Sequence, residues 1–340
     1  MKRFCAMGYA VIFMIMTVFS VAVPAWAQEK VIKLRYSNLF PPAHRMAQLA
    51  DQWCKEVEKR TNGRVVITYY SSSTLTPAGQ TYGAVVSGIA DVGESAVAFF
   101  PGRFPLTEIF SRPVGFTSGY QATKAVYEFH KKFQPKEWAD TKVMFLHGSA
   151  PQIIHTKKAI SSIKDVKGLR LKANAENAPT VSAVGAVPVT LTTGETYDAL
   201  QKGMVDGMMF PYESLKGWKF ADHIHYTLEN YAVAGAAPLF VAMNKQKWNS
   251  LPKDVQITIE KLNEEWIEKL AKAWDEIDEE GKAYGIQKGL KVVTPSKEEV
   301  SQTAEKMTPI IDKYVTDMKG KGLPGAEALT FVLDFIKTHP

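Results

Sequence analysis

Cysteine is scarce in this chain of 340 residues, which contains only Cys5 and Cys54. Cys5 lies within an expected leader peptide, so the mature chain would keep Cys54 alone and could form no intrachain disulfide. Cys54 follows Trp53 in a helical pattern, where we expect a buried and unreactive thiol. A chain of this length buries enough surface to fold without disulfides, and the length predicts two domains.

Several motifs that carry known chemistry are also missing. The sequence has no phosphate-binding Gly-Lys-Ser/Thr loop, no Cys-x-x-Cys, no His-Glu-x-x-His and no Gly-x-Ser-x-Gly. His223 and His225 have no third ligand nearby in the sequence, so we interpret them as exposed side chains. We therefore expect no catalytic residue, no metal site and no cofactor, which favours a binding protein over an enzyme.

Neither a strongly charged segment nor a second long apolar run is present. The formal net charge of +6 is spread along the chain without a basic arm or an RNA-binding signature, so we expect no nucleic-acid partner. The one long apolar run, residues 7–23, follows two basic residues and precedes the small-residue site Ala25-Trp26-Ala27. This order predicts a cleaved signal peptide over residues 1–27 and a periplasmic protein, with an uncleaved membrane anchor as the alternative.

Residues 165–218 organise the rest of the chain. Three short strands are predicted there, and the chain forms a short helix between each strand and the next. Parallel strands need such crossovers, and ligands on parallel sheets bind beyond the carboxyl ends of the strands. Lys172 and Phe210 lie near two of these ends, so we expect a cation and an aromatic face at one cleft.

A further sheet is predicted in the first third of the chain. Strands and helices alternate over residues 31–93, and Glu94 and Ser95 follow the last of these strands. His44 lies at the first turn of a helix, where backbone amides can face a bound anion. The stretch GAVVSGIADVG resembles ALQKGMVDGMM later in the chain, which suggests two equivalent units whose strand ends face each other across one cleft.

Two segments are expected to join the lobes. Residues 147–152 (HGSAPQ) follow a strand and combine flexible with rigid dihedrals, so we predict a loop that crosses between lobes. A long helix from residue 252 towards 284 carries Trp266 and Trp274 on one apolar stripe. We interpret the stripe as core and the helix as a strut across both lobes.

These elements carry a resemblance to a known family. The segments KGLRLK, GAVPVTL and ETYDALQKGMVDG, followed by Pro211, resemble the solute-binding proteins of tripartite ATP-independent periplasmic (TRAP) transporters. The segments HTKKAISSIKDVKG and MNKQKWNSLPKDVQ fit the same pattern, and the resemblance covers the whole chain after the leader. It implies an α/β fold of two lobes, with hinge-crossing strands and a long late helix, that closes over an organic acid and delivers it to a membrane permease.

Departures from the family pattern bear on the ligand. Many members have an arginine that holds the substrate carboxylate where this chain has Lys172, and Arg170 lies two residues earlier. A second arginine, common in dicarboxylate binders, aligns with Gln152. Lysine lacks the planar fork of arginine, and either Lys172 or Arg170 could carry the carboxylate contact. Fewer arginines and more aromatic residues suggest an aromatic or apolar monocarboxylate.

The sequence therefore predicts a periplasmic receptor for an organic acid. We expect lobe I at 28–149 plus 238–279 and lobe II at 150–237 plus 280–340. The alternatives are a C4-dicarboxylate or sugar-acid receptor of the same system, or a periplasmic enzyme or sensory protein on the same scaffold. The candidate ligand-binding residues are Lys172, Phe210, Gln152, Tyr212, Glu213, Glu94, Ser95, His44, Arg170 and Phe240.

Overall fold

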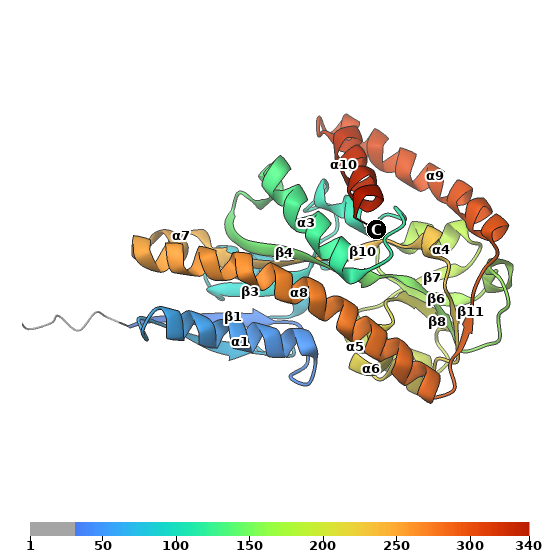
Figure 1. Cartoon of the computed structure of the whole chain (residues 1–340), viewed down its shortest axis with the longest axis horizontal. Helices are drawn as coiled ribbons and strands as arrows, with labels where there is room; N and C mark the ends of the chain where they lie inside the picture. The colour runs from blue at the N-terminus through green and yellow to red at the C-terminus, as the bar shows by residue number, and fades with distance from the viewer. Residues whose placement is uncertain (1–30, 340) are drawn as a thin grey trace, which may run out of the picture. The chain divides into compact units, whose positions relative to one another are not determined.

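The computed structural model describes residues 31–339, and the predicted signal peptide lies outside the described residues. Two β-sheets with helices around them form the described part of the chain (Figure 1). The strand order is β2-β1-β3-β10-β4 in the first sheet and β11-β9-β5-β8-β6-β7 in the second. Both sheets are mixed, since β10 and β5 run antiparallel to their neighbours while the other pairs are parallel. The α/β class predicted from the alternating elements is confirmed.

The first sheet is covered by helices whose apolar residues recur at helical spacing. In α1 these are Met46, Leu49, Ala50, Trp53 and Val57, all buried against the sheet. The predicted burial of Cys54 is confirmed. The elements around this sheet are β1 (Ile32–Asn38), α1 (Arg45–Arg60), β2 (Val65–Tyr70), α2 (Thr81–Ser87), β3 (Val92–Ala96), α3 (Gly119–Phe133), β4 (Thr141–Pro151), β10 (Ala236–Asn244) and α7 (Lys245–Asn249).

The second sheet contains the strand and helix alternation predicted over residues 165–218. Strands β6, β7 and β8 are parallel neighbours, because each helix between them returns the chain to the same edge. The elements here are β5 (Ile153–Thr156), β6 (Arg170–Ala173), α4 (Ala178–Ala183), β7 (Val187–Thr190), α5 (Thr193–Gln201), β8 (Gly207–Phe210), α6 (Glu213–Gly217), β9 (Tyr226–Leu228) and β11 (Lys291–Val293).

The chain passes from the first sheet to the second at Gln152, between β4 and β5. The crossover lies where it was predicted, but the prediction of a loop over residues 147–152 was wrong. Strand β4 continues to Pro151, because antiparallel β10 supplies backbone partners along this stretch, with Gly148 opposite Pro238. A paired strand holds the crossover more rigidly than a loop would.

Helix α8 (Lys253–Gln287) contacts elements of both sheets, as predicted for a strut. It packs on α1, α3 and β4 along one part of its length and on α6 along another (Figure 1). Its 35 residues extend over about 52 Å. The approach to α6 is close, because a Cβ atom on Gly281 would lie 2.2 Å from the carbonyl oxygen of Tyr212.

The last two helices, α9 (Lys297–Gly320) and α10 (Gly325–Thr338), pack on each other. Ala328 and Val332 of α10 are buried in one core cluster with Phe129 of α3, a helix of the first sheet. This packing leads us to propose that α10 belongs with lobe I, although residues 280–340 were assigned to lobe II from the sequence. The other lobe boundaries stay predictions.

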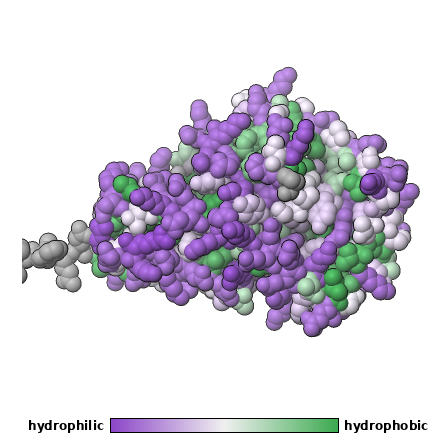
Figure 2. Space-filling view, viewed as in Figure 1, coloured by the Kyte–Doolittle hydropathy of each residue, from purple (hydrophilic) through white to green (hydrophobic). Residues whose placement is uncertain are grey.

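The face of the described chain that Figure 2 shows is mostly hydrophilic, and hydrophobic residues gather towards its lower right. Within residues 31–339 no helix has the length and apolar character that crossing a membrane requires.

Candidate functional site

A small cavity lies between the two sheets. Its volume is about 60 Å³, which is room for about two water molecules at the liquid volume of about 30 Å³ each. Leu39 and Phe40 follow β1, Ala96 ends β3, and Asn174 and Phe210 stand at the ends of β6 and β8. The carboxyl ends of parallel strands from both sheets therefore meet at this cavity, which is where a ligand is expected on such sheets.

Five aromatic side chains line the cavity, namely Phe40, Phe99, Phe210, Trp218 and Trp274. Phe40 and Trp274 form an edge contact with their ring centroids 6.3 Å apart. Trp274 comes from α8, whereas Phe210 and Trp218 come from the second sheet and the end of α6. Such walls stabilise an apolar or aromatic ligand body by burying it.

Lys172 is fully buried behind this aromatic wall. Its Nζ atom lies 3.9 Å from the ring centroid of Phe210 and donates a hydrogen bond to Asn174 Oδ1 at 2.7 Å. No carboxylate among residues 31–339 pairs with this ammonium group, and burial alone lowers the pKa of Lys172 well below its ordinary value. A buried cation without a counter-ion is costly, and a bound anion beside it would reduce that cost.

Two carboxamide groups present N–H donors to the cavity. Asn174 and Gln152 both line it, and the oxygen of each already accepts a hydrogen bond from behind. Lys172 donates to Asn174, and Asn177 Nδ2 donates to Gln152 Oε1 at 2.8 Å. The amide N–H groups of both side chains have no acceptor within the described residues. We call Lys172, Asn174 and Gln152 the carboxylate seat, since two amide donors backed by a lysine suit that group.

Glu213 is the one acidic residue among those that line the cavity. Its Oε2 atom lies 3.0 Å from His44 Nε2, and both side chains are buried. The backbone N–H of Met46 donates to His44 Nδ1, so the ring proton lies on Nε2 and is donated to Glu213. Gly217 leaves space for this pair, since a Cβ atom there would lie 2.8 Å from Glu213 Oε2.

The His44–Glu213 pair also borders a wider depression of about 520 Å³, which Lys216 and Glu280 line farther out. Glu213 therefore belongs to both hollows. Behind it, Asp278 of α8 accepts the backbone N–H of Glu213 at 2.9 Å, and burial raises the pKa of Asp278 to about 8.

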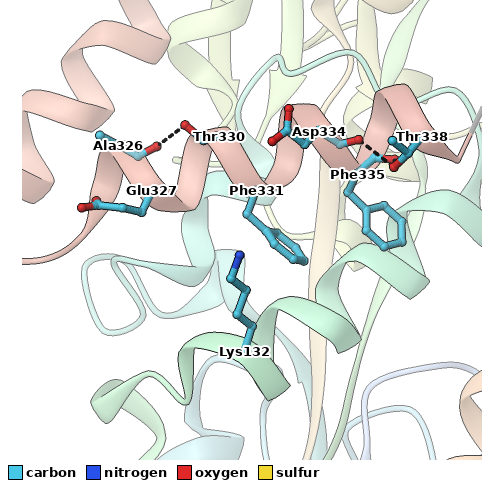
Figure 3. Close-up of a pocket in the computed structure, with 8 residues that line it drawn as sticks. All are labelled: Lys132, Ala326, Glu327, Thr330, Phe331, Asp334, Phe335 and Thr338. Atoms are coloured by element: carbon cyan, nitrogen blue, oxygen red, sulfur yellow. Dashed lines mark hydrogen bonds between the residues drawn. The ribbon is translucent and has the colours of Figure 1, made fainter.

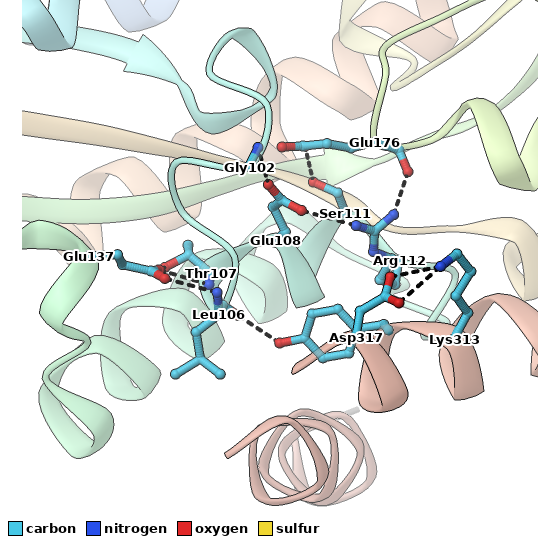
Figure 4. Close-up of polar contacts among 11 residues, drawn as sticks. Gly102, Leu106, Thr107, Glu108, Ser111, Arg112, Glu137, Glu176, Lys313 and Asp317 are labelled. Carbon is cyan, nitrogen blue, oxygen red and sulfur yellow. Dashed lines mark hydrogen bonds and ion pairs between the residues drawn. The ribbon is translucent and has the colours of Figure 1, made fainter. Parts of the chain in front are cut away.

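A further buried acid, Glu176, connects the loop after β6 to the segment before α3 (Figure 4). Glu176 Oε2 accepts a hydrogen bond from Ser111 Oγ at 2.7 Å, and its backbone oxygen accepts one from Arg112 Nη1 at 2.9 Å. Arg112 also pairs with Glu108 at 3.1 Å. Burial raises the pKa of Glu176 to about 7. This contact holds the loop that carries Asn174 against the first-sheet side of the molecule.

Comparison with known proteins places this geometry in a family. Residues 36–317 match the model of the family described as bacterial extracellular solute-binding protein, family 7 (DctP). The chain belongs to this family. A TRAP periplasmic solute-binding protein from Desulfovibrio salexigens is 34% identical, with a TM-score of 0.82 over 91% of this chain and 96% of that chain. The family consists of solute receptors of transporters, so this TRAP receptor for organic acids is not an enzyme.

Two further relatives are informative about ligands. The TRAP solute-binding protein of Rhodoferax ferrireducens, solved with copurified benzoate, is 25% identical with a TM-score of 0.84, covering 91% of this chain and 98% of that one. The C4-dicarboxylate-binding periplasmic protein DctP of Vibrio cholerae is 25% identical over 78% of this chain and 80% of its own length. Relatives of this receptor thus include binders of aromatic monocarboxylates and of dicarboxylates.

Half of the candidate residues of the TRAP receptor gather at the cavity. Gln152, Phe210 and Glu213 line it, Lys172 contacts Phe210, and His44 stacks on Phe40 with ring centroids 4.5 Å apart. Their contact with a ligand stays a prediction, and their placement supports it.

Arg170 lies outside the cavity, which corrects the suggestion that it could hold the carboxylate. It stands at the amino end of β6, where its Nε atom pairs with Asp206 at 3.0 Å and Nη2 donates to Gly203 O at 2.8 Å. Phe240 is also misplaced as a stacking candidate. Its ring lies in a buried aromatic cluster with Tyr82, 5.7 Å away between centroids, on the face of β10 turned from the cavity.

Tyr212, Glu94 and Ser95 are buried but are not among the cavity-lining residues either. The Tyr212 hydroxyl donates to Glu229 at 3.0 Å, and Ser95 Oγ donates to Ala78 O at 2.8 Å. Glu94 accepts hydrogen bonds from the side chains of Tyr36 and Asn38 of β1.

Sequence reasoning missed Asn174, Phe40 and Trp274 as lining residues. The sequence could have indicated Asn174 as a lining residue, because it is the first polar residue beyond the carboxyl end of β6. Trp274 was assigned to the core stripe of α8, and it is indeed buried, but its ring also faces the cavity.

A further hollow of the described chain has a different lining. A groove of about 600 Å³ lies between α3 and α10, where Lys132 Nζ is 5.1 Å from the ring centroid of Phe331 (Figure 3). Residues 320–325 have the spacing Gly-x-Gly-x-x-Gly, but they join two helices with no strand before them, so a nucleotide site is not indicated. Among residues 31–339 no cluster of three or more His, Cys, Asp or Glu side chains could hold a metal ion.

Proposed function

We propose that this receptor binds an organic monocarboxylate with an apolar or aromatic body, in the periplasm, and passes it to a TRAP membrane permease. The observation that carries the proposal is the carboxylate seat, in which Lys172 is buried without an acidic partner among the described residues. A carboxylate against the N–H groups of Asn174 and Gln152 would gain charge-assisted hydrogen bonds, worth about 1.5–3 kcal/mol each. A micromolar dissociation constant requires about 8 kcal/mol in total.

The rest of the cavity favours one carboxylate over two. Aromatic and aliphatic side chains make up most of the remaining wall, with Glu213 as its one charged group, and no arginine lines it. A second carboxylate would therefore be buried beside a negative charge or a hydrocarbon surface. A hydroxyl group could instead donate to Glu213. Relatives that bind benzoate or mandelate support a monocarboxylate ligand. The dicarboxylate-binding relative supports the alternative of a C4-dicarboxylate ligand.

Closure over the acid would use contacts with both lobes. The carboxylate seat lies at the end of β6 and at the crossover residue Gln152, whereas Phe40 follows β1 and Trp274 belongs to α8. A ligand shifts the equilibrium between open and closed forms only by its difference in affinity for the two. An acid that contacts both the carboxylate seat and the aromatic wall would bind the closed form more tightly than the open form.

The proposal is tested by a thermal-shift panel of benzoate, isobutyrate, succinate, malate and glucuronate, because a ligand that binds the native state raises the melting temperature. We expect the largest shift with benzoate and none with the diacids. Lys172→Met should abolish the shift and leave the unliganded melting temperature equal or higher, because it removes a buried amine. Lys132→Met is the matched control, since this lysine also lies over a phenylalanine ring but in the groove of Figure 3.

Two results would overturn the proposal. One is a strong shift with succinate or malate and none with any monocarboxylate. The other is a benzoate shift in Lys172→Met as large as in the wild-type protein.

A further inference from the structure

Glu94 is the centre of a buried hydrogen-bond network on the first sheet. Tyr36 Oη donates to its Oε2 atom at 2.7 Å, and Asn38 Nδ2 donates to the same atom at 2.5 Å. Its Oε1 atom lies 3.3 Å from His147 Nε2. Glu94 is 2% exposed and His147 is 0% exposed, so this network is sealed from solvent.

Two arms of the network end on aromatic residues that line the cavity. In the first arm, Asn38 Oδ1 accepts the backbone N–H of Phe40 at 2.7 Å, which fixes the turn after β1. In the second arm, His147 Nδ1 accepts the indole N–H of Trp274 at 3.0 Å. Because that nitrogen is an acceptor, the ring proton of His147 lies on Nε2, the atom that faces Glu94. The carboxylate of Glu94 therefore favours the Nε2-protonated tautomer of His147, whose Nδ1 atom can accept the indole N–H of Trp274.

We propose that Glu94 is a positioning residue that fixes Phe40 and Trp274 and so sets the selectivity of the cavity for aromatic over aliphatic acids. The inference rests on the proposed function, but it concerns the ligand body, while the carboxylate seat lies at the second sheet and the crossover. A carboxylate suits this position because it only accepts hydrogen bonds. Tyr36 and Asn38 donate to it, and His147 Nε2 lies against its other oxygen at 3.3 Å as an electrostatic contact and not a hydrogen bond.

A neutral carboxamide at position 94 cannot satisfy the same neighbours. In Glu94→Gln one end of the side chain becomes a donor, and it would face either the donors Tyr36 and Asn38 or the N–H of His147. At least one arm is then released. We expect the ratio of benzoate to isobutyrate affinity to fall by about fivefold or more, within the range of measured couplings between contacting residues. Isobutyrate affinity should change less than the benzoate affinity, since its small body depends less on the two rings.

The matched control is Glu137→Gln. Glu137 is a half-buried acid of the first-sheet side, and it accepts hydrogen bonds from Leu106 N and Thr107 N at 2.8 Å and 2.9 Å. It does not line the cavity. A loss of stability without a change in the affinity ratio is expected there, which separates positioning from a general effect on folding.

Trp274→Phe provides a second test that does not depend on how well Glu94→Gln folds. It keeps an aromatic ring but removes the indole N–H that His147 accepts. We expect a lower benzoate-to-isobutyrate ratio in this variant and little further loss when Glu94→Gln is added, because both changes break the same arm. Calorimetric titration of the four proteins with both acids gives the ratios.

The outcomes distinguish this inference from the proposed function. If the wild-type protein binds neither acid, the proposed function fails. If it binds benzoate well and Glu94→Gln keeps the wild-type ratio, the positioning role is wrong. If Glu94→Gln cannot be obtained folded, an unchanged ratio in Trp274→Phe overturns the positioning role by itself.

Discussion

The two sheets carry the same hydrogen-bonded arrangement at the aspartates that directly precede β3 and β8. In the first sheet, Asp91 Oδ2 accepts the backbone N–H of Arg35 at 2.8 Å, while Arg35 Nη2 donates to Gly88 O at 2.8 Å. In the second, Asp206 Oδ2 accepts the backbone N–H of Arg170 at 3.0 Å, while Arg170 Nη2 donates to Gly203 O at 2.8 Å. We call each set an arginine clamp. The repeat noticed in the sequence, GAVVSGIADVG and ALQKGMVDGMM, contains the glycine and the aspartate of each clamp.

The carboxyl ends of the same units differ in charge. Strand β3 leads to Glu94, whose carboxylate is surrounded by donors, whereas β6 and β8 lead to Lys172 and Phe210. The acid has its partners inside the protein, and the lysine has no anionic partner among the described residues. The comparison teaches that the aspartates before these strands maintain the fold, and we propose that the carboxyl ends divide the recognition of a ligand between its body and its charge.

The largest expected effect is a pH dependence of benzoate affinity that comes from Lys172, which has no acidic partner among the described residues. Burial lowers the pKa of Lys172, and a bound carboxylate would favour its charged form and raise that pKa again. Between the two pKa values, binding therefore takes up a proton, and benzoate affinity should fall by up to about tenfold for each unit of rising pH. Calorimetry from pH 6 to 9 in buffers of different ionisation enthalpy measures the uptake.

Lys132→Met should keep this proton uptake, since its lysine lies outside the cavity. A benzoate affinity that stays constant across the range, without proton uptake, would contradict the role of Lys172.

Effects of intermediate size on the free energy of unfolding are expected for the two arginine clamps. Asp91→Asn and Asp206→Asn should each lower the free energy of unfolding by about 1–3 kcal/mol, the usual cost of weakening a charge-assisted hydrogen bond. Urea denaturation measures both, and ligand affinity should remain unchanged. Loss of benzoate binding in Asp206→Asn alone would show that the two clamps are not equivalent.

The Asp206 clamp also predicts an acid limb of stability. Its side-chain hydrogen bond from Arg170 lowers the pKa of Asp206 to about 2, below the value of about 4 expected in the unfolded chain. The clamp therefore stabilises the protein fully above about pH 4, and this contribution is lost as the pH falls towards 2. Asp206→Asn should reduce the slope of stability against pH in that interval.

The smallest expected effect tests the contact between Glu176 and Ser111, where the two regions meet. Burial raises the pKa of Glu176 to about 7, above its value of about 4.3 in an unfolded chain, so folding takes up a proton between these values. The stability that this carboxyl contributes is present below about pH 4 and is lost as the pH rises through 7. Glu176→Gln should therefore lose less stability than the wild-type protein as the pH rises from 5 to 8.

Melting temperatures across that pH range provide the measurement for Glu176. Glu327→Gln on the exposed side of α10 is the control and should follow the wild-type protein. An identical pH response in wild type and Glu176→Gln would exclude a titrating contact at this position.

Local patterns in the sequence predicted the elements of the fold well. The alternation over residues 165–218, the repeat, and the long amphipathic α8 all depend on neighbours within a few turns of the chain. The loop expected over residues 147–152 failed because its strand character comes from pairing with β10, almost 90 residues later. No pattern within a few turns of the chain predicts a strand partner that is so distant in the sequence.

The site was predicted less completely because facing directions depend on tertiary contacts. Phe240 and its neighbours in β10 are almost all buried, so strand periodicity could not show which of them faces the cavity. Trp274 reaches the cavity only because α8 crosses both regions. The direction of the Asn174 and Gln152 amides depends on Lys172 and Asn177, which hold their oxygens from behind.

The absence of a side chain at Gly217 has a practical consequence for redesign of the pocket. A methyl group there would lie 2.8 Å from Glu213 Oε2 and 3.0 Å from His44 Cδ2, so even alanine would push apart the groups that divide the inner cavity from the outer depression. Libraries aimed at new substrates should therefore vary the aromatic lining and keep position 217 fixed.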